Sequence, residues 1–187
     1  MLHIAGIVGG LNADSHNKLL LSAFSDQLPE EVYFELLDIT TLPFFNPANV
    51  ESVTSEVTSF KGALDKADGI VIATPEYNRS IPAPLKNAID WTSYPTSKNS
   101  WADKPVFVMG ASTGAIGTAV AQYHLKQILV YLNARILGQP ELCVGFAHER
   151  FNKNGDIIDP ATRTLIITAA TSFIDFVKQF KNTVALK

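Results

Sequence analysis

Short apolar runs alternate along this chain with longer segments in which apolar residues recur every three or four positions. Runs of the first kind are typical of strands buried on both faces of a sheet, and the second pattern is typical of amphipathic helices. Four strands are predicted on this basis, at residues 2–8, 32–39, 69–75 and 105–112. Residues 136–145 predict a further strand, short and interrupted.

The helical periodicity predicts five helices between and after these strands. The first four cover residues 17–28, 53–67, 82–91 and 117–132. Asp159 is expected to cap the last helix, because a proline, Pro160, follows it at the first helical position. In the fourth helix, the residues expected on the buried stripe are Ala121, Leu125, Ile128 and Leu132.

Strands that alternate with helices require crossover connections, and these build a parallel sheet with helices on both faces. The chain has 187 residues, of which 47% are apolar, so a single domain with a sizeable core is expected. The predicted fold is therefore α/β: a flavodoxin-like three-layer α/β/α sandwich over residues 1–187, with a five-stranded parallel sheet in the order 2-1-3-4-5.

Charge and cysteine content exclude several classes of function. The net charge of −3 disfavours nucleic acid as a partner. The single cysteine, Cys143, can form no internal disulfide and argues against a cysteine-based metal site, which favours a reducing cytoplasmic setting. No leading signal segment is recognised and no apolar stretch approaches the roughly 20 residues that span a bilayer, so no membrane association is expected.

Three loops rich in glycine and polar residues follow the first, third and fourth predicted strands. Their sequences are "GGLNADSHN" (9–17), "PEYNRSIP" (75–82) and "ASTGAIG" (111–117). In an open parallel sheet, ligands bind at the carboxyl ends of the strands near the switch point, where these loops must lie. The site is predicted there.

Each loop allows a functional and a structural interpretation. Gly9 and Gly10 permit close backbone approach, and the amides of the following helix favour an anion, although a capped helix after a glycine turn has the same pattern. In the second loop Tyr77 offers a flat ring and Asn78 can donate and accept hydrogen bonds. There the alternative is a solvated ion pair between Glu76 and Arg79 under a packed tyrosine.

The third loop is close to the glycine loop of short-chain dehydrogenases, and "YHLK" (123–126) to their tyrosine and lysine pair. Both spacings differ by one residue. The chain after Gly110 is also too short for the strands and catalytic helix of that fold. We therefore reject this interpretation.

The stretch "PEYNRSIPAPLKNAIDW" (75–91) resembles the signature of the NADPH-dependent FMN reductase family, which includes bacterial quinone, azo-dye and chromate reductases. The resemblance extends to "GIVGGLNADSHN", "ADGIVIATPEYN" and "KPVFVMGASTGAIG". It implies an FMN-dependent enzyme in which NADPH or NADH delivers hydride to flavin N5, and a quinone, azo compound or free flavin then accepts it. No side chain is needed as a nucleophile, so no catalytic residue and no metal are expected.

The resemblance also implies which residues hold the cofactor. In the family pattern for the phosphate, Gly-Ser-Leu-Arg-x-x-Ser-x-Asn, the matching residues are Gly9, Leu11, Ser15 and Asn17. Gly10 and Asn12 stand where the family usually has serine and arginine, so one hydroxyl and one positive charge are missing. Residues implied at the flavin ring and ribityl chain are Pro75, Glu76, Tyr77, Asn78 and Ile81, with Ser112, Thr113 and Gly114 at the pyrimidine edge.

Two further expectations follow from the implied flavin. The helix starting near Gly117 would direct its positive end to the N1/C2 region of the ring and stabilise the reduced flavin by about 0.3–1 kcal/mol. A homodimer or homotetramer is also implied, and Phe44, Phe45 and Trp101 are candidate exposed aromatics for its contacts. A flavodoxin-type electron carrier and a flavin-free domain on the same fold remain as alternatives.

Overall fold

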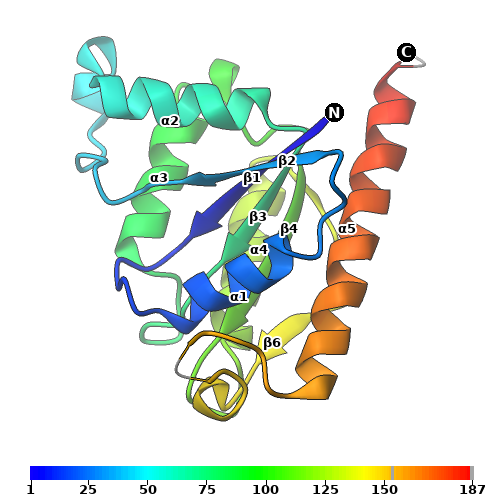
Figure 1. The fold of residues 1–187 in the computed structure, drawn as a ribbon. Coiled ribbons are helices and arrows are strands. Elements are labelled where there is room, and N and C mark those ends of the chain that lie inside the picture. The colour runs from blue at the N-terminus through cyan, green and yellow to red at the C-terminus, as the bar shows by residue number, and fades with distance from the viewer. Residues whose placement is uncertain (153, 186–187) are drawn as a thin grey trace.

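The computed structural model describes residues 1–152 and 154–185 and shows a parallel sheet between two layers of helices (Figure 1). The strands are β1 Leu2–Val8, β2 Val32–Leu37, β3 Gly69–Ala73, β4 Pro105–Ala111, β5 Arg135–Ile136 and β6 Leu142–Val144. The α-helices are α1 His16–Ser25, α2 Ser55–Lys66, α3 Ala83–Ser93, α4 Ala119–Tyr131 and α5 Pro160–Ala185. Short 3₁₀ helices cover Pro47–Ser52, Thr96–Lys98 and Ala147–Glu149.

The strand order confirms the predicted topology. The sheet runs β2-β1-β3-β4-β5, and every pairing is parallel. The fifth position holds two short strands in the described part of the chain, because β5 pairs with the start of β4 and β6 with its end. The predicted interruption is thus confirmed, and Pro140, which has no N–H for the ladder, lies within it.

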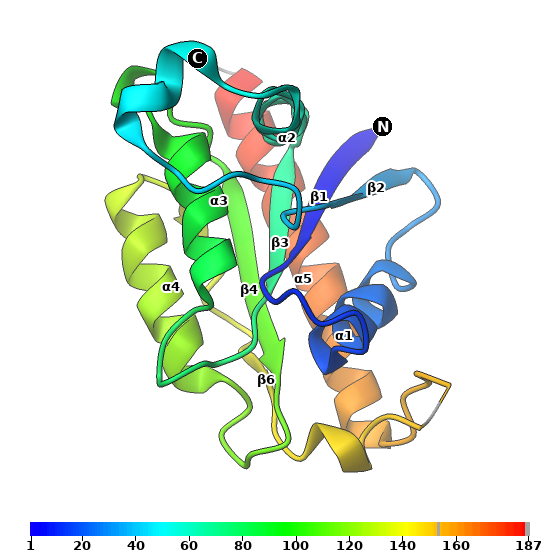
Figure 2. The ribbon, with the colours of Figure 1, turned by 90° about the vertical axis from the view of Figure 1, so that its left-hand side faces the viewer.

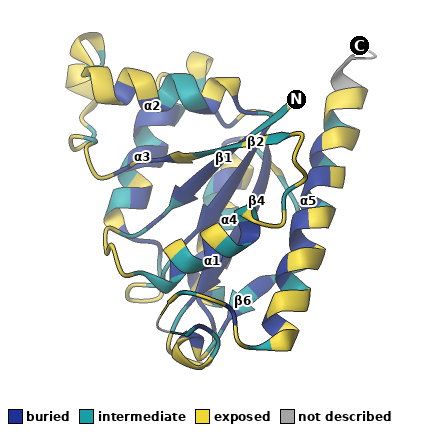
Figure 3. Ribbon diagram, in the orientation of Figure 1, coloured by how far each residue is buried: buried dark blue, intermediate teal, exposed yellow. Residues whose placement is uncertain are grey.

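The helices cover both faces of the sheet (Figures 1 and 2). One apolar cluster joins the sheet to α1 and α5 through side chains such as Phe24 and Phe173. The other joins it to α2, α3 and α4 through side chains such as Leu64, Leu85 and Leu125. The central strands are buried on both faces, as their continuous apolar sequences predict (Figure 3).

Several helix boundaries differ from the expectation by a few residues. Helix α4 begins at Ala119 rather than Gly117, because Gly117 and Thr118 have left-handed φ angles of 58° and 67°. On its buried stripe Leu129 is fully buried and Ile128 only partly. At the start of α5 the expected cap is present, since the amide of Thr162 donates to Asp159 Oδ2 at 2.8 Å.

The three aromatic residues considered for contacts between copies differ in exposure. The side chain of Phe44 is 89% exposed, whereas Phe45 is partly buried against Trp91 at a centroid distance of 5.1 Å. Trp101 is fully buried, and its Nε1 donates to Thr92 Oγ1 at 2.9 Å. The expectation that Trp101 is a surface residue is therefore wrong, because a buried hydroxyl satisfies its indole N–H.

Candidate functional site

Three loops meet at the carboxyl edge of the sheet. The first loop (9–15) follows β1, the second loop (74–82) follows β3 and the third loop (112–118) follows β4. Their strands are neighbours in the order β1-β3-β4, so the loops lie side by side below the strand ends (Figure 2). This edge, next to the switch point between β1 and β3, is where the sequence predicted the site.

The predicted site residues differ in exposure. Those exposed to solvent are Asn12, Tyr77, Asn78, Thr113 and Gly114. Those partly buried are Gly10, Ser15, Pro75, Glu76 and Ser112. Those buried are Gly9, Asn17 and Ile81. The exposed and partly buried residues can reach a ligand directly, whereas the buried ones shape the loops from beneath.

The first loop ends in a capped helix with free amides. Ser15 Oγ accepts from the amide of Asn17 at 3.2 Å, and Asn12 Oδ1 from the amide of Asp14 at 3.0 Å. Among the described residues, nothing accepts from the amides of Leu11 and His16. The His16 N–H, at the positive end of α1, is suited to an anion, and the Leu11 N–H in the same loop is free to contribute.

Asn17 joins the first loop to the third. Its side-chain Nδ2 donates to the carbonyl of Ala111 at 2.9 Å, and its Oδ1 accepts from the amide of Ala111 at 2.8 Å. The residue is 2% exposed. The backbone of Ala111 therefore occupies both polar groups of the amide side chain.

A tight hairpin forms the second loop. Tyr77 and Ser80 exchange two backbone hydrogen bonds of 3.0 Å, and the two residues between them, Asn78 and Arg79, have φ angles of 51° and 63°. Positive φ at both central positions is the signature of a type I′ turn. Tyr77 remains 53% exposed, so it is not the packed lid of the structural alternative.

The carboxylate of Glu76 ties the second loop to α4. One oxygen lies 3.1 Å from Arg79 Nη1, which is the ion pair expected in the structural alternative. The other accepts from the backbone amide of Ala121 at 3.1 Å and so caps the first turn of α4. A carboxylate thus already partly neutralises the positive end of α4, which was expected to point toward the N1/C2 region of the flavin ring.

Glycines allow the loops and strands to touch. A Cβ on Gly10 would lie 3.0 Å from Pro75 Cγ, which places the first loop directly against the second. A Cβ on Gly110 would lie 1.9 Å from Thr118 Oγ1 and 2.5 Å from the carbonyl oxygen of Thr74. Only glycine fits at position 110. Sequence reasoning did not single out this residue, although a glycine at the end of a central strand signals close approach.

The third loop is held to the end of β6. The amide of Ser112 donates to the carbonyl of Val144 at 3.0 Å, and the carbonyl of Ser112 accepts from the amide of Ala147 at 2.9 Å. Ser112 Oγ turns back to the carbonyl of Gly114 at 3.2 Å. The segment after β6 therefore supports the site, a role that the weak strand pattern there could not reveal.

Neither Cys143 nor Tyr123 has the lowered pKa of an activated nucleophile. Burial raises the pKa of the Cys143 thiol. A hydrogen bond to Glu141 raises the pKa of the Tyr123 phenol, which is opposite to what a dehydrogenase tyrosine requires. Among the described residues, no group of three or more histidine, cysteine or acidic side chains could hold a metal, and no helix is long and apolar enough to cross a membrane.

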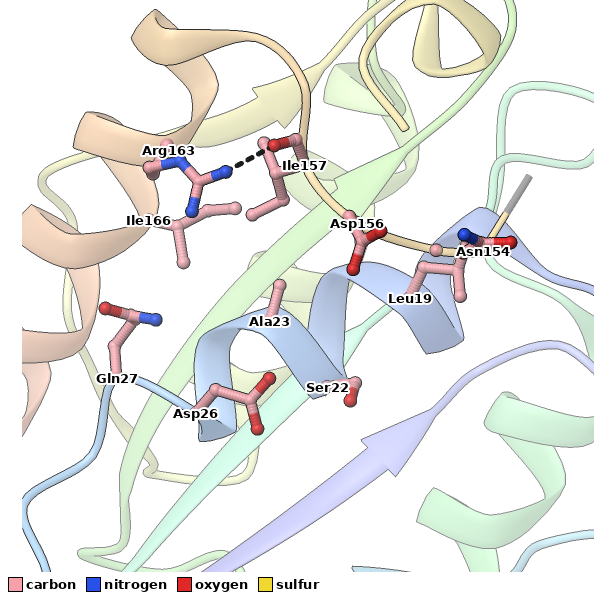
Figure 4. A pocket seen from close by; sticks show the side chains of 11 residues that line it. Leu19, Ser22, Ala23, Asp26, Gln27, Asn154, Asp156, Ile157, Arg163 and Ile166 are labelled. Atoms are coloured by element: carbon pink, nitrogen blue, oxygen red, sulfur yellow. Dashed lines mark hydrogen bonds between the residues drawn. The ribbon is translucent and has the colours of Figure 1, made fainter. Parts of the chain in front are cut away.

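Two cavities lie near α1. One of about 330 Å³ lies between the first loop and the end of β2, and Asn12, Lys18 and Asp38 line part of it. The other, of about 460 Å³, lies between α1, α5 and the loop before α5, where Arg163 donates to the carbonyl of Ile157 (Figure 4). None of the predicted site residues lines the second cavity.

Known proteins resemble the chain over most of its length. A family profile described as NADPH-dependent FMN reductase matches residues 2–149. A 2-hydroxy-1,4-benzoquinone reductase from Burkholderia is 38% identical over 177 residues, covering 95% of this chain and 97% of the relative. An NAD(P)H-dependent FMN reductase from Pseudomonas aeruginosa is 37% identical over 166 residues, with 88% and 89% coverage. The structure of FerB, a flavoenzyme NAD(P)H:(acceptor) oxidoreductase from Paracoccus denitrificans, superposes with a TM-score of 0.90 at 32% identity, covering 96% of this chain and 99% of that one.

Proposed function

The chain belongs to the NADPH-dependent FMN reductase family, and on that premise we propose that its three loops hold the FMN of an NAD(P)H-dependent quinone reductase. The family supplies the chemistry: when bound, FMN takes hydride from NAD(P)H and passes electrons to an acceptor. Relatives named for quinone reduction make a small quinone the expected acceptor. The chain itself must bind, orient and partly expose the flavin.

The residues at the strand edge fit a phosphorylated flavin. The observation that carries this proposal is that, among the described residues, nothing accepts from the amide of His16, at the start of α1, or from that of Leu11, in the loop before it. These amides suit the phosphate, and Tyr77 of the second loop, which is 53% exposed, offers a flat ring with its hydroxyl beside Gly10 of the first loop. The edge therefore offers amides for an anion and an exposed aromatic face for a ring.

Each predicted residue has a proposed role at this edge. The first loop places backbone amides, and the Ser15 hydroxyl caps its helix close to the phosphate. The type I′ turn holds Asn78 where its amide can face the polar edge of the ring. The proposed site residues remain Gly9, Gly10, Asn12, Ser15, Asn17, Pro75, Glu76, Tyr77, Asn78, Ile81, Ser112, Thr113 and Gly114, of which the buried Gly9, Asn17 and Ile81 are proposed to shape the loops rather than to contact the cofactor.

Reconstitution and turnover test this proposal. Protein incubated with FMN and desalted should keep a yellow chromophore that NADPH or NADH bleaches without oxygen. The nicotinamide should then be consumed steadily with a benzoquinone and no partner reductase, which distinguishes an enzyme from an electron carrier. Protein that takes up no FMN would count against the proposal and favour a flavin-free domain.

We also propose that the protein works in the cytoplasm as a homodimer or homotetramer, without nucleic-acid or membrane partners. The exposed Phe44 supports a contact between copies, since three hydrogen bonds fix the segment that carries it. Trp91 Nε1 and Asn87 Nδ2 both donate to the carbonyl of Pro43, at 2.7 and 2.9 Å. Light scattering after size-exclusion chromatography should show an oligomer that Phe44→Ser weakens.

A further inference from the structure

We propose that Asn17 is a positioning residue that fixes the spacing between the first and third loops, and that it does not contact the flavin phosphate. This inference rests on the proposed function, because it concerns how the two ends of the cofactor crevice are held in register. It assigns a different task to a residue that the sequence resemblance places in the phosphate pattern.

The side chain of Asn17 is almost completely buried, and both of its polar groups are bonded to Ala111. Its Nδ2 donates to the carbonyl of Ala111 and its Oδ1 accepts from the amide of the same residue, at 2.9 and 2.8 Å. It is 2% exposed, and Ala111 is also 2% exposed. Only the second N–H of Nδ2 and the second lone pair of Oδ1 remain unused, and burial of the residue keeps both away from a ligand in the loops.

The sheet provides no equivalent link. β3 lies between β1 and β4, so no ladder bond joins the start of the first loop to the start of the third. Asn17, in the first turn of α1, reaches directly to Ala111, the last residue of β4. This side chain therefore adds a direct link between the two loops to the indirect one through β3, where the amide of Gly9 donates to Ala73 and the amide of Thr74 to Met109.

Asparagine is the side chain suited to this position. It offers one donor and one acceptor in the same plane, which matches the amide and carbonyl of a single residue. Aspartate would direct a carboxylate oxygen at the carbonyl of Ala111, and leucine would leave both backbone groups unpaired. A purely apolar or purely anionic replacement cannot reproduce the contact.

A positioning role and a phosphate contact of Asn17 predict different effects on flavin binding. Riboflavin lacks the phosphate but shares the ring and ribityl chain with FMN. If Asn17 positions both loops, Asn17→Ser weakens the binding of riboflavin, by about tenfold, as well as that of FMN. If Asn17 only contacts the phosphate, the substitution weakens FMN binding and leaves riboflavin binding unchanged. Ser15→Ala, beside the amides proposed for the phosphate, is the matched control. It should weaken the binding of FMN but not that of riboflavin.

Hydrogen exchange tests the same inference without depending on flavin binding. In the cofactor-free protein, the Ala111 amide should be protected, and Asn17→Ser but not Ser15→Ala should accelerate its exchange. If Asn17→Ser does not fold, the wild-type protein decides, because the Ala111 amide should stay protected when FMN is added. Loss of that protection on FMN binding, or a selective loss of FMN affinity in Asn17→Ser, overturns the inference. Absence of any flavin binding by wild type would instead overturn the proposed function.

Discussion

Replacing Glu76 with alanine separates the second loop from α4. The substitution removes the carboxylate that accepts from the amide of Ala121 at 3.1 Å and pairs with Arg79 at 3.1 Å. The side chain of Glu76 is 13% exposed, so the amide it caps lies in a largely desolvated place. Both the stability of the domain and the position of the hairpin should therefore change.

The cap accounts for most of the expected effect. Loss of a side-chain helix cap costs about 1 kcal/mol, within a range of roughly 0.5–2 kcal/mol. The ion pair adds little, because the Arg79 side chain is 66% exposed and such pairs contribute about 0–1 kcal/mol. A total near 1.5 kcal/mol corresponds to a fall in melting temperature of about 3–6 °C for a chain of this length.

Two controls separate the contributions. Arg79→Ala removes only the exposed ion pair and should change the unfolding free energy by less than about 0.5 kcal/mol. Glu76→Gln keeps an oxygen for the Ala121 amide and should fall between the other two variants. Calorimetry of the cofactor-free proteins at pH 7 measures all three. A Glu76→Ala protein as stable as Arg79→Ala would refute the assignment of the cap.

Four further substitutions have expected outcomes. Gly110→Ala should yield insoluble protein or lower the free energy of unfolding by more than about 3 kcal/mol, because the added Cβ would lie 1.9 Å from the Thr118 hydroxyl. Gly62→Ala, in open space within α2, should raise the free energy of unfolding by about 0.5–1 kcal/mol. Solubility and urea unfolding measure both effects. Lys61→Met should lower the free energy of unfolding in urea by about 2 kcal/mol, because Lys61 Nζ donates to two carbonyls and a hydroxyl. Hydrogen bonds from the Thr162 side chain and amide lower the pKa of Asp159 below its usual 3.8. The stabilisation of the folded state by this carboxylate is therefore present above pH 3.8 and is lost as the pH falls through the pKa of Asp159 in the folded protein. Asp159→Asn should therefore show a shallower fall in melting temperature than wild type between pH 4 and strongly acidic pH.

The sequence was sufficient for the fold because periodicity reports burial directly. Continuous apolar runs at residues 69–75 and 105–112 could only be central strands, and the glycine-rich segments after them had to meet at one edge. All three loops can be located in this way from the sequence alone. Boundaries were less accurate, as at Gly117 and Thr118, because left-handed turns are set by tertiary contact.

The details of the site depend on contacts between distant residues, which no local pattern encodes. The cap from Glu76 to Ala121 spans 45 residues, and the indole of Trp101 finds a buried hydroxyl on α3. The turn at Asn78 and Arg79 lacks the glycine that usually marks a type I′ hairpin. Its conformation therefore could not be recognised from residue types alone.

The bond between Asn17 and Ala111 joins positions 94 residues apart and spans the intervening strand β3. During vectorial synthesis, a nascent chain that has exposed only its first two strands can offer isolated amides but no closed crevice. Closing so long a loop is an entropic cost that must be met before the contact can form. Cofactor capture should consequently be a late event in biogenesis, after β4 has left the ribosome and docked.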